Sequence, residues 1–133
     1  MERPQWMRVE ERRGKRRVIF CGGRDFADYP FILRSVGRLL RDRGWRPADV
    51  RAVHGAAPGA DTLAARACRA LGIEAVPYPA DWRRLGKAAG PARNREMLVK
   101  ELPCLVVAFP GGRGTANMLE LAKGRSVPIW MPE

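Results

Sequence analysis

The residues with the clearest chemical capability lie in the glycine-rich stretch Phe109-Pro-Gly-Gly-Arg-Gly-Thr115. This stretch follows an apolar run at 105–108 and precedes a helix-like segment at 116–123. Glycines let the main chain approach an anion closely, and the first amides of a helix point outward without internal partners. The stretch therefore predicts a phosphate site, although a tight turn without a ligand would leave the same pattern. The predicted contacts are Gly111, Gly112, Arg113, Gly114 and Thr115.

Two further glycine clusters follow predicted strands. The stretch Gly22-Gly23-Arg24-Asp25 ends the run at 18–21, and His54-Gly55-Ala-Ala-Pro-Gly-Ala-Asp61 ends the run at 50–54. Arg24 can pair with a phosphate through two parallel hydrogen bonds, whereas Asp25 could accept from a ribose hydroxyl or cap the next helix. Asp61 lies in a first helical turn, where a carboxylate suits the helix dipole. The ligand contacts predicted from these clusters are Gly22, Gly23, Arg24, Gly55 and Asp61.

The segment 80–91 predicts a long polar connection, and long connections in compact domains are often functional. Trp82 could stack on a base or cover the core. Lys87, Arg93 and Asn94 could reach a phosphate or a base edge, with Arg93 and Asn94 near the start of a helix at 92–101. The alternative is a solvated basic loop.

Short apolar runs alternate with helical patterns along the chain. The predicted strands are 18–21, 50–54, 73–76, 105–108 and 127–130, and the helices between them are 31–43, 60–71, 92–101 and 116–123. This alternation predicts an α/β fold, a Rossmann-like three-layer sandwich with a mostly parallel sheet of about five strands. Ligands of such sheets bind beyond the carboxyl ends of the strands, where the three glycine clusters should form one cleft.

Length and composition predict a single domain at 16–133 behind a basic, flexible head at 1–15. No apolar run approaches the ~20 residues of a membrane helix, and no signal-peptide core is present, so we expect a cytoplasmic protein without a membrane partner. The three cysteines have no paired spacing, which argues against a disulfide framework or a zinc site. Cys21 and Cys104 adjoin apolar runs and are expected to be buried. With His54 as its one histidine, the chain offers no two-histidine metal site.

The formal net charge is +11, from 25 Lys+Arg against 14 Asp+Glu. Such an excess attracts polyanions, so nucleic-acid binding stays open as an alternative. A genome rich in G and C would also raise the arginine content, and the excess of arginine would then have no functional cause.

Five ordered motifs carry a resemblance to a known family. They are Gly-Gly-Arg-Asp-Phe at 22–26, His-Gly-x-Ala-x-Gly-Ala-Asp at 54–61, Ala-Asp-Trp at 80–82, Gly-Lys-Ala-Ala-Gly-Pro-x-Arg-Asn-x-x-Met at 86–97, and Phe-Pro-Gly-Gly-x-Gly-Thr-Ala-Asn-Met at 109–118. Together they resemble the YspA-type, cpYpsA-related branch of the SLOG superfamily over residues 17–130. The resemblance implies a Rossmann-like fold and a nucleotide or nucleotide-derived ligand, with no further cofactor.

The wider superfamily includes DNA-processing protein A and the cytokinin-activating phosphoribohydrolases, which share the Pro-Gly-Gly-x-Gly-Thr loop. Those hydrolases follow the loop with a catalytic glutamate, whereas this chain has Ala116, Asn117 and Met118 there. Glycosidic cleavage builds positive charge on the sugar, which a carboxylate normally stabilises. The remaining candidate acids are Asp25, Asp61 and Glu120.

These observations favour a nucleotide-binding sensor or processing module, in which Asp61 and Asn117 contact ribose or base. A phosphoribohydrolase or N-glycosidase is the enzyme alternative, and a nucleic-acid-binding protein is the third. Edge strands also leave homo-oligomer formation open.

Overall fold

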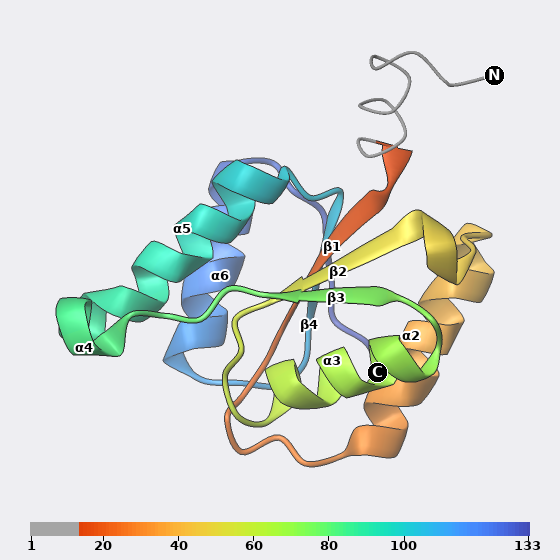
Figure 1. The fold of residues 1–133 in the computed structure, drawn as a ribbon, viewed down its shortest axis with the longest axis horizontal. Helices are drawn as coiled ribbons and strands as arrows, with labels where there is room; N and C mark the ends of the chain where they lie inside the picture. Colours follow the sequence, from red (N-terminus) through yellow and green to blue (C-terminus); the bar gives the residue numbers. More distant parts are fainter. Residues whose placement is uncertain (1–13) are drawn as a thin grey trace, which may run out of the picture.

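The structure, a computed structural model, describes residues 14–133. Five parallel strands form one sheet in the order β3-β2-β1-β4-β5 (Figure 1). The strands are β1 (Arg16–Cys21), β2 (Val50–His54), β3 (Glu74–Pro77), β4 (Leu105–Ala108) and β5 (Ile129–Trp130). The prediction of a Rossmann-like α/β fold with about five strands is therefore confirmed.

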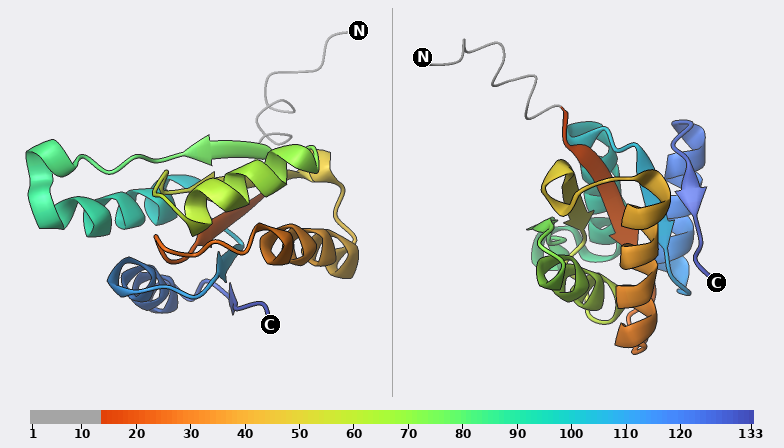
Figure 2. Two further views of the ribbon diagram at one scale, coloured as in Figure 1. Left: turned by 90° about the horizontal axis from the view of Figure 1, so that it is seen from below. Right: turned by 90° about the vertical axis from the view of Figure 1, so that its right-hand side faces the viewer.

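Helices cover both faces of this sheet, and Figure 2 shows the layers from two further directions. The α-helices are α2 (Tyr29–Arg43), α3 (Ala60–Ala70), α4 (Trp82–Leu85), α5 (Ala89–Glu101) and α6 (Arg113–Gly124), and the short 3-10 helices are η1 (Pro47–Asp49) and η2 (Gly86–Ala88). Alternate residues of β1 divide the core. Val18 and Phe20 pack with α2 and α3, whereas Ile19 packs with α5 and α6. Because all three are fully buried, β1 is the centre of the molecule.

Local sequence signals explain the ends of the helices. The Asp28 carboxylate accepts a hydrogen bond from the Phe31 amide at 3.1 Å and caps α2. Gly44 ends the same helix with φ at 66°, in the left-handed region that glycine adopts without strain.

The prediction that 80–91 is a connection without helices is wrong, because α4, η2 and the start of α5 lie within this segment. Asp81 caps the short helix α4 by accepting from the Arg84 amide at 3.1 Å, and α5 begins at Ala89 rather than at residue 92. The side chains at 82–88 are exposed, so no apolar periodicity marks this segment as helical. The expected burial of Cys104 is also wrong, because Cys104 is exposed while Cys21 and Cys68 are buried.

Most of the predicted basic head lies outside the described residues, which begin at Gly14. From that residue to the end of the chain, none of the helices has the length and apolar character needed to cross a lipid bilayer.

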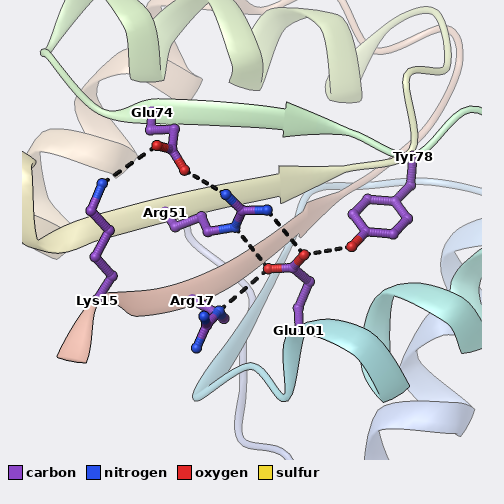
Figure 3. A network of polar contacts seen from close by, with 6 residues as sticks. All are labelled: Lys15, Arg17, Arg51, Glu74, Tyr78 and Glu101. Carbon is purple, nitrogen blue, oxygen red and sulfur yellow. Dashed lines mark hydrogen bonds and ion pairs between the residues drawn. The ribbon is translucent and has the colours of Figure 1, made fainter. Parts of the chain in front are cut away.

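One carboxylate joins several elements at the amino-terminal side of the sheet. Glu101, at the end of α5, accepts two hydrogen bonds from Arg51 at 2.9 and 3.2 Å and one from the Tyr78 hydroxyl at 2.5 Å (Figure 3). Arg17 of β1 lies 3.4 Å from the same carboxylate. The network ties α5 to β1 and β2 through charge-assisted bonds.

Candidate functional site

The candidate site lies where the order of the strands changes direction. From β1 the chain moves to β2 and β3 on one side of the sheet and then to β4 and β5 on the other. The register pairs Phe20 with both His54 and Val107, so the turns after β1, β2 and β4 start at the same level. Figure 1 shows these turns gathered at one edge of the sheet. In open α/β sheets, this switch point is where ligands bind.

The turn after β1 is tied directly to the turn after β4. The Gly23 amide donates to the Pro110 carbonyl oxygen at 2.8 Å. A methyl group at Gly23 would lie 2.9 Å from the same oxygen, and one at Gly22 would lie 3.0 Å from Cβ of Phe109. Both glycines therefore serve the close approach of two strand ends.

The same turn also meets the start of α3. The Gly23 carbonyl oxygen accepts from the Ala60 amide at 3.0 Å. Gly59 adopts φ of 78°, and any side chain there would collide with the carbonyl oxygens of Gly23 and Arg24. The three strand-end turns thus form one connected piece of main chain.

Asp61 organises the turn after β2. Its buried carboxylate accepts hydrogen bonds at Oδ2 from the Gly55 amide at 3.1 Å and the Ala57 amide at 3.3 Å. Burial raises the pKa of Asp61 to about 6, against the two amide bonds and the charge of Arg93, which lower it. A carboxyl group with this pKa carries a mixed protonation state in mildly acidic solution.

His54 fixes the conformation of the same turn. Its Nδ1 accepts from the Ala56 amide at 3.0 Å, and Ala56 has φ of 57°. Burial and the charges of Arg69 and Arg93 lower the pKa of His54, whose buried Nε2 has no partner among the described residues. His54 is therefore a neutral residue that shapes the turn, the structural role that is the more common one for a lone histidine, and its contact with the Ala56 amide is the part that the sequence did not indicate.

A second chain of polar contacts joins α5 to the strand-end turns. Arg93 donates to the carbonyl oxygens of Gly55 and Tyr78, and its Nε donates to Oδ1 of Asn94 at 2.9 Å. Asn94 then donates to Asn117 Oδ1 at 3.0 Å and to the Gly114 carbonyl oxygen at 3.3 Å. The structure therefore brings Arg93, Asn94 and Asn117 together behind the turns.

Arg24, in the turn after β1, lies against Trp82 at the start of α4. The Arg24 guanidinium is 5.3 Å from the centre of the Trp82 ring, within the range of a cation–π contact. A methyl group at Gly90 would lie 3.2 Å from the ring edge, so this glycine accommodates the indole. Trp82 is 47% exposed, so an aromatic surface accompanies the cation of Arg24.

The residues predicted to contact an anion lie at the start of α6. The first helical hydrogen bond runs from the Ala116 amide to the Gly112 oxygen at 3.0 Å, so the amides before Ala116 have no acceptor within the helix. Among the described residues, no side chain caps this end. Residues 111–114 are exposed, whereas Thr115 is buried with its hydroxyl against Gly111.

The remaining site residues predicted from the sequence are exposed side chains. Asp25 and Lys87 are exposed. Glu120 is exposed too, and helix geometry places it about 140° around α6 and about 7.5 Å along it from Thr115. These positions separate Glu120 from the face that bears Thr115.

We expect Asp61→Asn to change how stability depends on pH. The pKa of Asp61 is raised in the folded chain, so its contribution is fully present below about pH 4 and is lost as pH rises through about 6. The free energy of unfolding of the variant, relative to that of the parent, should therefore increase by about 2 kcal/mol from pH 4.5 to pH 7. Urea unfolding of the parent and the variant at both pH values measures this difference. Because His54 is present in both proteins, its titration contributes equally to each and does not affect the comparison. A difference that is the same at both values would contradict the prediction.

A hollow of about 470 Å³ lies away from these turns, at the opposite edge of the sheet. It is bounded by Leu102 and Pro103 after α5 and by residues 124–128 after α6. The candidate site is therefore defined by its turns and polar groups rather than by this hollow.

Comparisons with known proteins agree with this architecture. Residues 16–85 match the model of the family described as YspA, cpYpsA-related SLOG family. The Gene 61 protein of Mycobacterium phage D29 is 34% identical over 121 residues, which cover 86% of this chain and 94% of that protein.

Two solved structures share the fold at low sequence identity. DNA processing protein A from Streptococcus pneumoniae is 21% identical with a TM-score of 0.65, over 88% of this chain and 50% of that one. The structural genomics target TM1055 is 18% identical with a TM-score of 0.63, over 86% of this chain and 72% of that one. The chain thus spans half the length of the first. From the family match and the phage relative, the chain belongs to the YspA, cpYpsA-related SLOG family.

Proposed function

We propose that this domain binds a nucleotide or nucleotide-derived ligand at the strand-end turns. The observation that carries the proposal is the joining of three glycine turns by main-chain contacts at the switch point, beside the uncapped start of α6. Such a rigid arrangement of main-chain donors suits a phosphate, because the donors need little reorganisation on binding.

We propose that the phosphate binds to the backbone amides at 111–115 and that the Arg24 guanidinium reorients to contact it. Arg24 is exposed and stacked on Trp82, so it can turn towards an anion at the cost of one cation–π contact. Arg93 is held by two carbonyl oxygens and is better suited to shaping the turn than to following a ligand.

The proposed ribose contact is Asp61. Its two amide donors both reach Oδ2, which leaves Oδ1 for a sugar hydroxyl. The base would then lie towards Trp82, whose ring is anchored at Gly90.

Isothermal titration of the purified protein with inorganic phosphate, the four nucleoside monophosphates, NAD, ADP-ribose and a cyclic dinucleotide tests the proposal. We expect at least one nucleotide to bind and inorganic phosphate to bind far more weakly, because it lacks the sugar and base. A folded protein that gives no heat with any of these ligands would overturn the proposal.

Trp82→Ala should weaken binding of the preferred nucleotide by about 10-fold, since stacking of a base on an aromatic ring contributes about 1–3 kcal/mol. Leu85→Ala is the matched control, because Leu85 is an exposed apolar residue of the same short helix. Equal affinities for the parent and the Trp82 variant would place the base elsewhere.

The enzyme alternative has a direct assay. Incubation of nucleoside monophosphates with a high concentration of the protein, followed by chromatography for free base, measures N-glycosidase activity. We expect no release, because Asn117 is neutral and Glu120 lies on another face of α6. If the parent protein releases free base and the Asp61→Asn variant does not, the reaction would instead be assigned to the strand-end turns.

A further inference from the structure

Most of the net positive charge of the protein lies outside residues 1–13. Residues 1–13 contain four arginines and three glutamates, a net excess of one. Ten of the eleven net positive charges therefore lie at 14–133. Their distribution over the helices shows where a polyanion would be attracted.

The helix α2 carries three arginines on one outward face. Arg34, Arg38 and Arg41 follow the i, i+4, i+7 spacing that aligns side chains along a helix. They lie opposite the face of α2 that packs in the core. None forms an ion pair with a described carboxylate, although Arg38 donates to the main-chain oxygen of Glu133 at 3.5 Å.

The neighbouring helix α3 extends this charge. It packs along α2 and adds the exposed Arg66 and Arg69. The Arg66 guanidinium lies 4.3 Å from the ring centre of Tyr29 and so bridges the two helices. Within α2 and α3, both described in full, the acidic residues are Asp42 and the buried Asp61.

Aromatic rings hold two of these cations in place. Besides Arg66 on Tyr29, Arg38 lies 5.2 Å from the ring centre of Trp130. A guanidinium held by a ring loses less rotamer entropy when it binds an anion, and its planar fork still matches phosphate oxygens. We call the surface of Arg34, Arg38, Arg41, Arg66 and Arg69 the α2–α3 arginine face.

We propose that the α2–α3 arginine face docks on the phosphate backbone of a nucleic acid. Charge complementarity is the main support, since Arg34 to Arg41 spans about 10 Å of helix axis and would pass about three phosphates of one strand. A membrane surface fits less well, because the large exposed apolar side chains of the described chain lie outside both helices. An acidic protein partner fits less well too, because stable protein interfaces have an apolar centre.

Fluorescence anisotropy with a labelled 20-nucleotide strand and its duplex tests this docking surface at 50 and 200 mM salt. Arg34→Glu/Arg38→Glu/Arg41→Glu should lower affinity at 50 mM salt at least 10-fold and reduce the salt slope by about 2–3. The matched control, Arg95→Glu/Lys123→Glu/Arg125→Glu, makes the same change of net charge on the other helical layer and should retain most of the affinity.

Three outcomes would overturn the inference. They are no binding by the parent protein at 50 mM salt, an equal loss in the control, or an α2 variant that binds nucleic acid normally but no longer binds anionic phospholipid vesicles. Thermal melting checks the fold, and the milder Arg34→Gln/Arg38→Gln/Arg41→Gln variant serves if the glutamate variant unfolds. Nucleotide titration should be unchanged in both α2 variants. The experiment therefore distinguishes failure of the proposed nucleotide site at the strand-end turns from failure of the proposed docking on the α2–α3 arginine face.

Discussion

Replacing Gly111 with alanine is expected to abolish nucleotide binding and to lower the free energy of unfolding by about 2–4 kcal/mol. A methyl group at this position would lie 2.7 Å from the Gly23 amide nitrogen and 2.9 Å from the Gly22 carbonyl carbon, and it would collide with the Thr115 hydroxyl. Two of these neighbours are main chain and cannot turn aside. The turns after β1 and β4 must therefore separate.

Gly112→Ala and Gly124→Ala provide the comparison. Neither methyl group would meet a described atom within 4 Å, so neither should alter the melting temperature by more than a few degrees. Gly112 lies within the proposed phosphate-binding amides at 111–115, so a methyl group there should lower nucleotide affinity, whereas Gly124→Ala should leave it unchanged. Normal binding by Gly111→Ala would show that the ligand does not use this turn.

Glu101→Gln is expected to lower the free energy of unfolding by about 2–4 kcal/mol, because it leaves Arg51 and Arg17 facing a neutral amide in a partly buried site. Burial of Glu101 opposes its ionisation, but the hydrogen bonds from Arg51 and Tyr78 and the arginine charges hold its pKa below the ordinary value. The stabilisation is therefore present at neutral pH and is lost as pH falls through that lowered pKa.

Glu74→Gln is the matched control for this network. Glu74 also binds Arg51, at 2.7 Å, but its side chain is 44% exposed, and exposed pairs contribute at most about 1 kcal/mol. Denaturant unfolding at pH 7 and pH 3 compares the two variants with the parent. Equal losses in both variants would mean that burial of Glu101 does not set the strength of the network.

The sequence was sufficient to predict the sheet because its signals are local and apolar. The runs at 18–21 and 105–108 are fully buried strands, and their continuous hydrophobicity requires cover on both faces. The helix α4 was missed since its side chains are exposed, yet Asp81 three residues before Arg84 is a capping signal that could have located it.

The adjacency of the glycine turns could also be predicted, because parallel strands end at one edge. The partners of the polar side chains could not. Asn94 and Asn117 meet only because α5 packs on α6, and Arg93 reaches Gly55 across the sheet end. Such pairings depend on helix positions that no local pattern encodes, so residues proposed as ligand contacts prove to bind one another.

The central position of β1 has a consequence for synthesis of the chain. One edge of β1 pairs with β2, which follows it closely in the sequence. The other edge of β1 pairs with β4, which begins at Leu105, 84 residues after Cys21. A nascent chain that has emerged only to residue 85 would present an open, apolar strand edge to its neighbours. Ribosomal pausing or truncation within that interval should therefore favour aggregation. The glycine-rich turn at 109–115 follows β4 directly, so it is completed only after this strand edge has been covered.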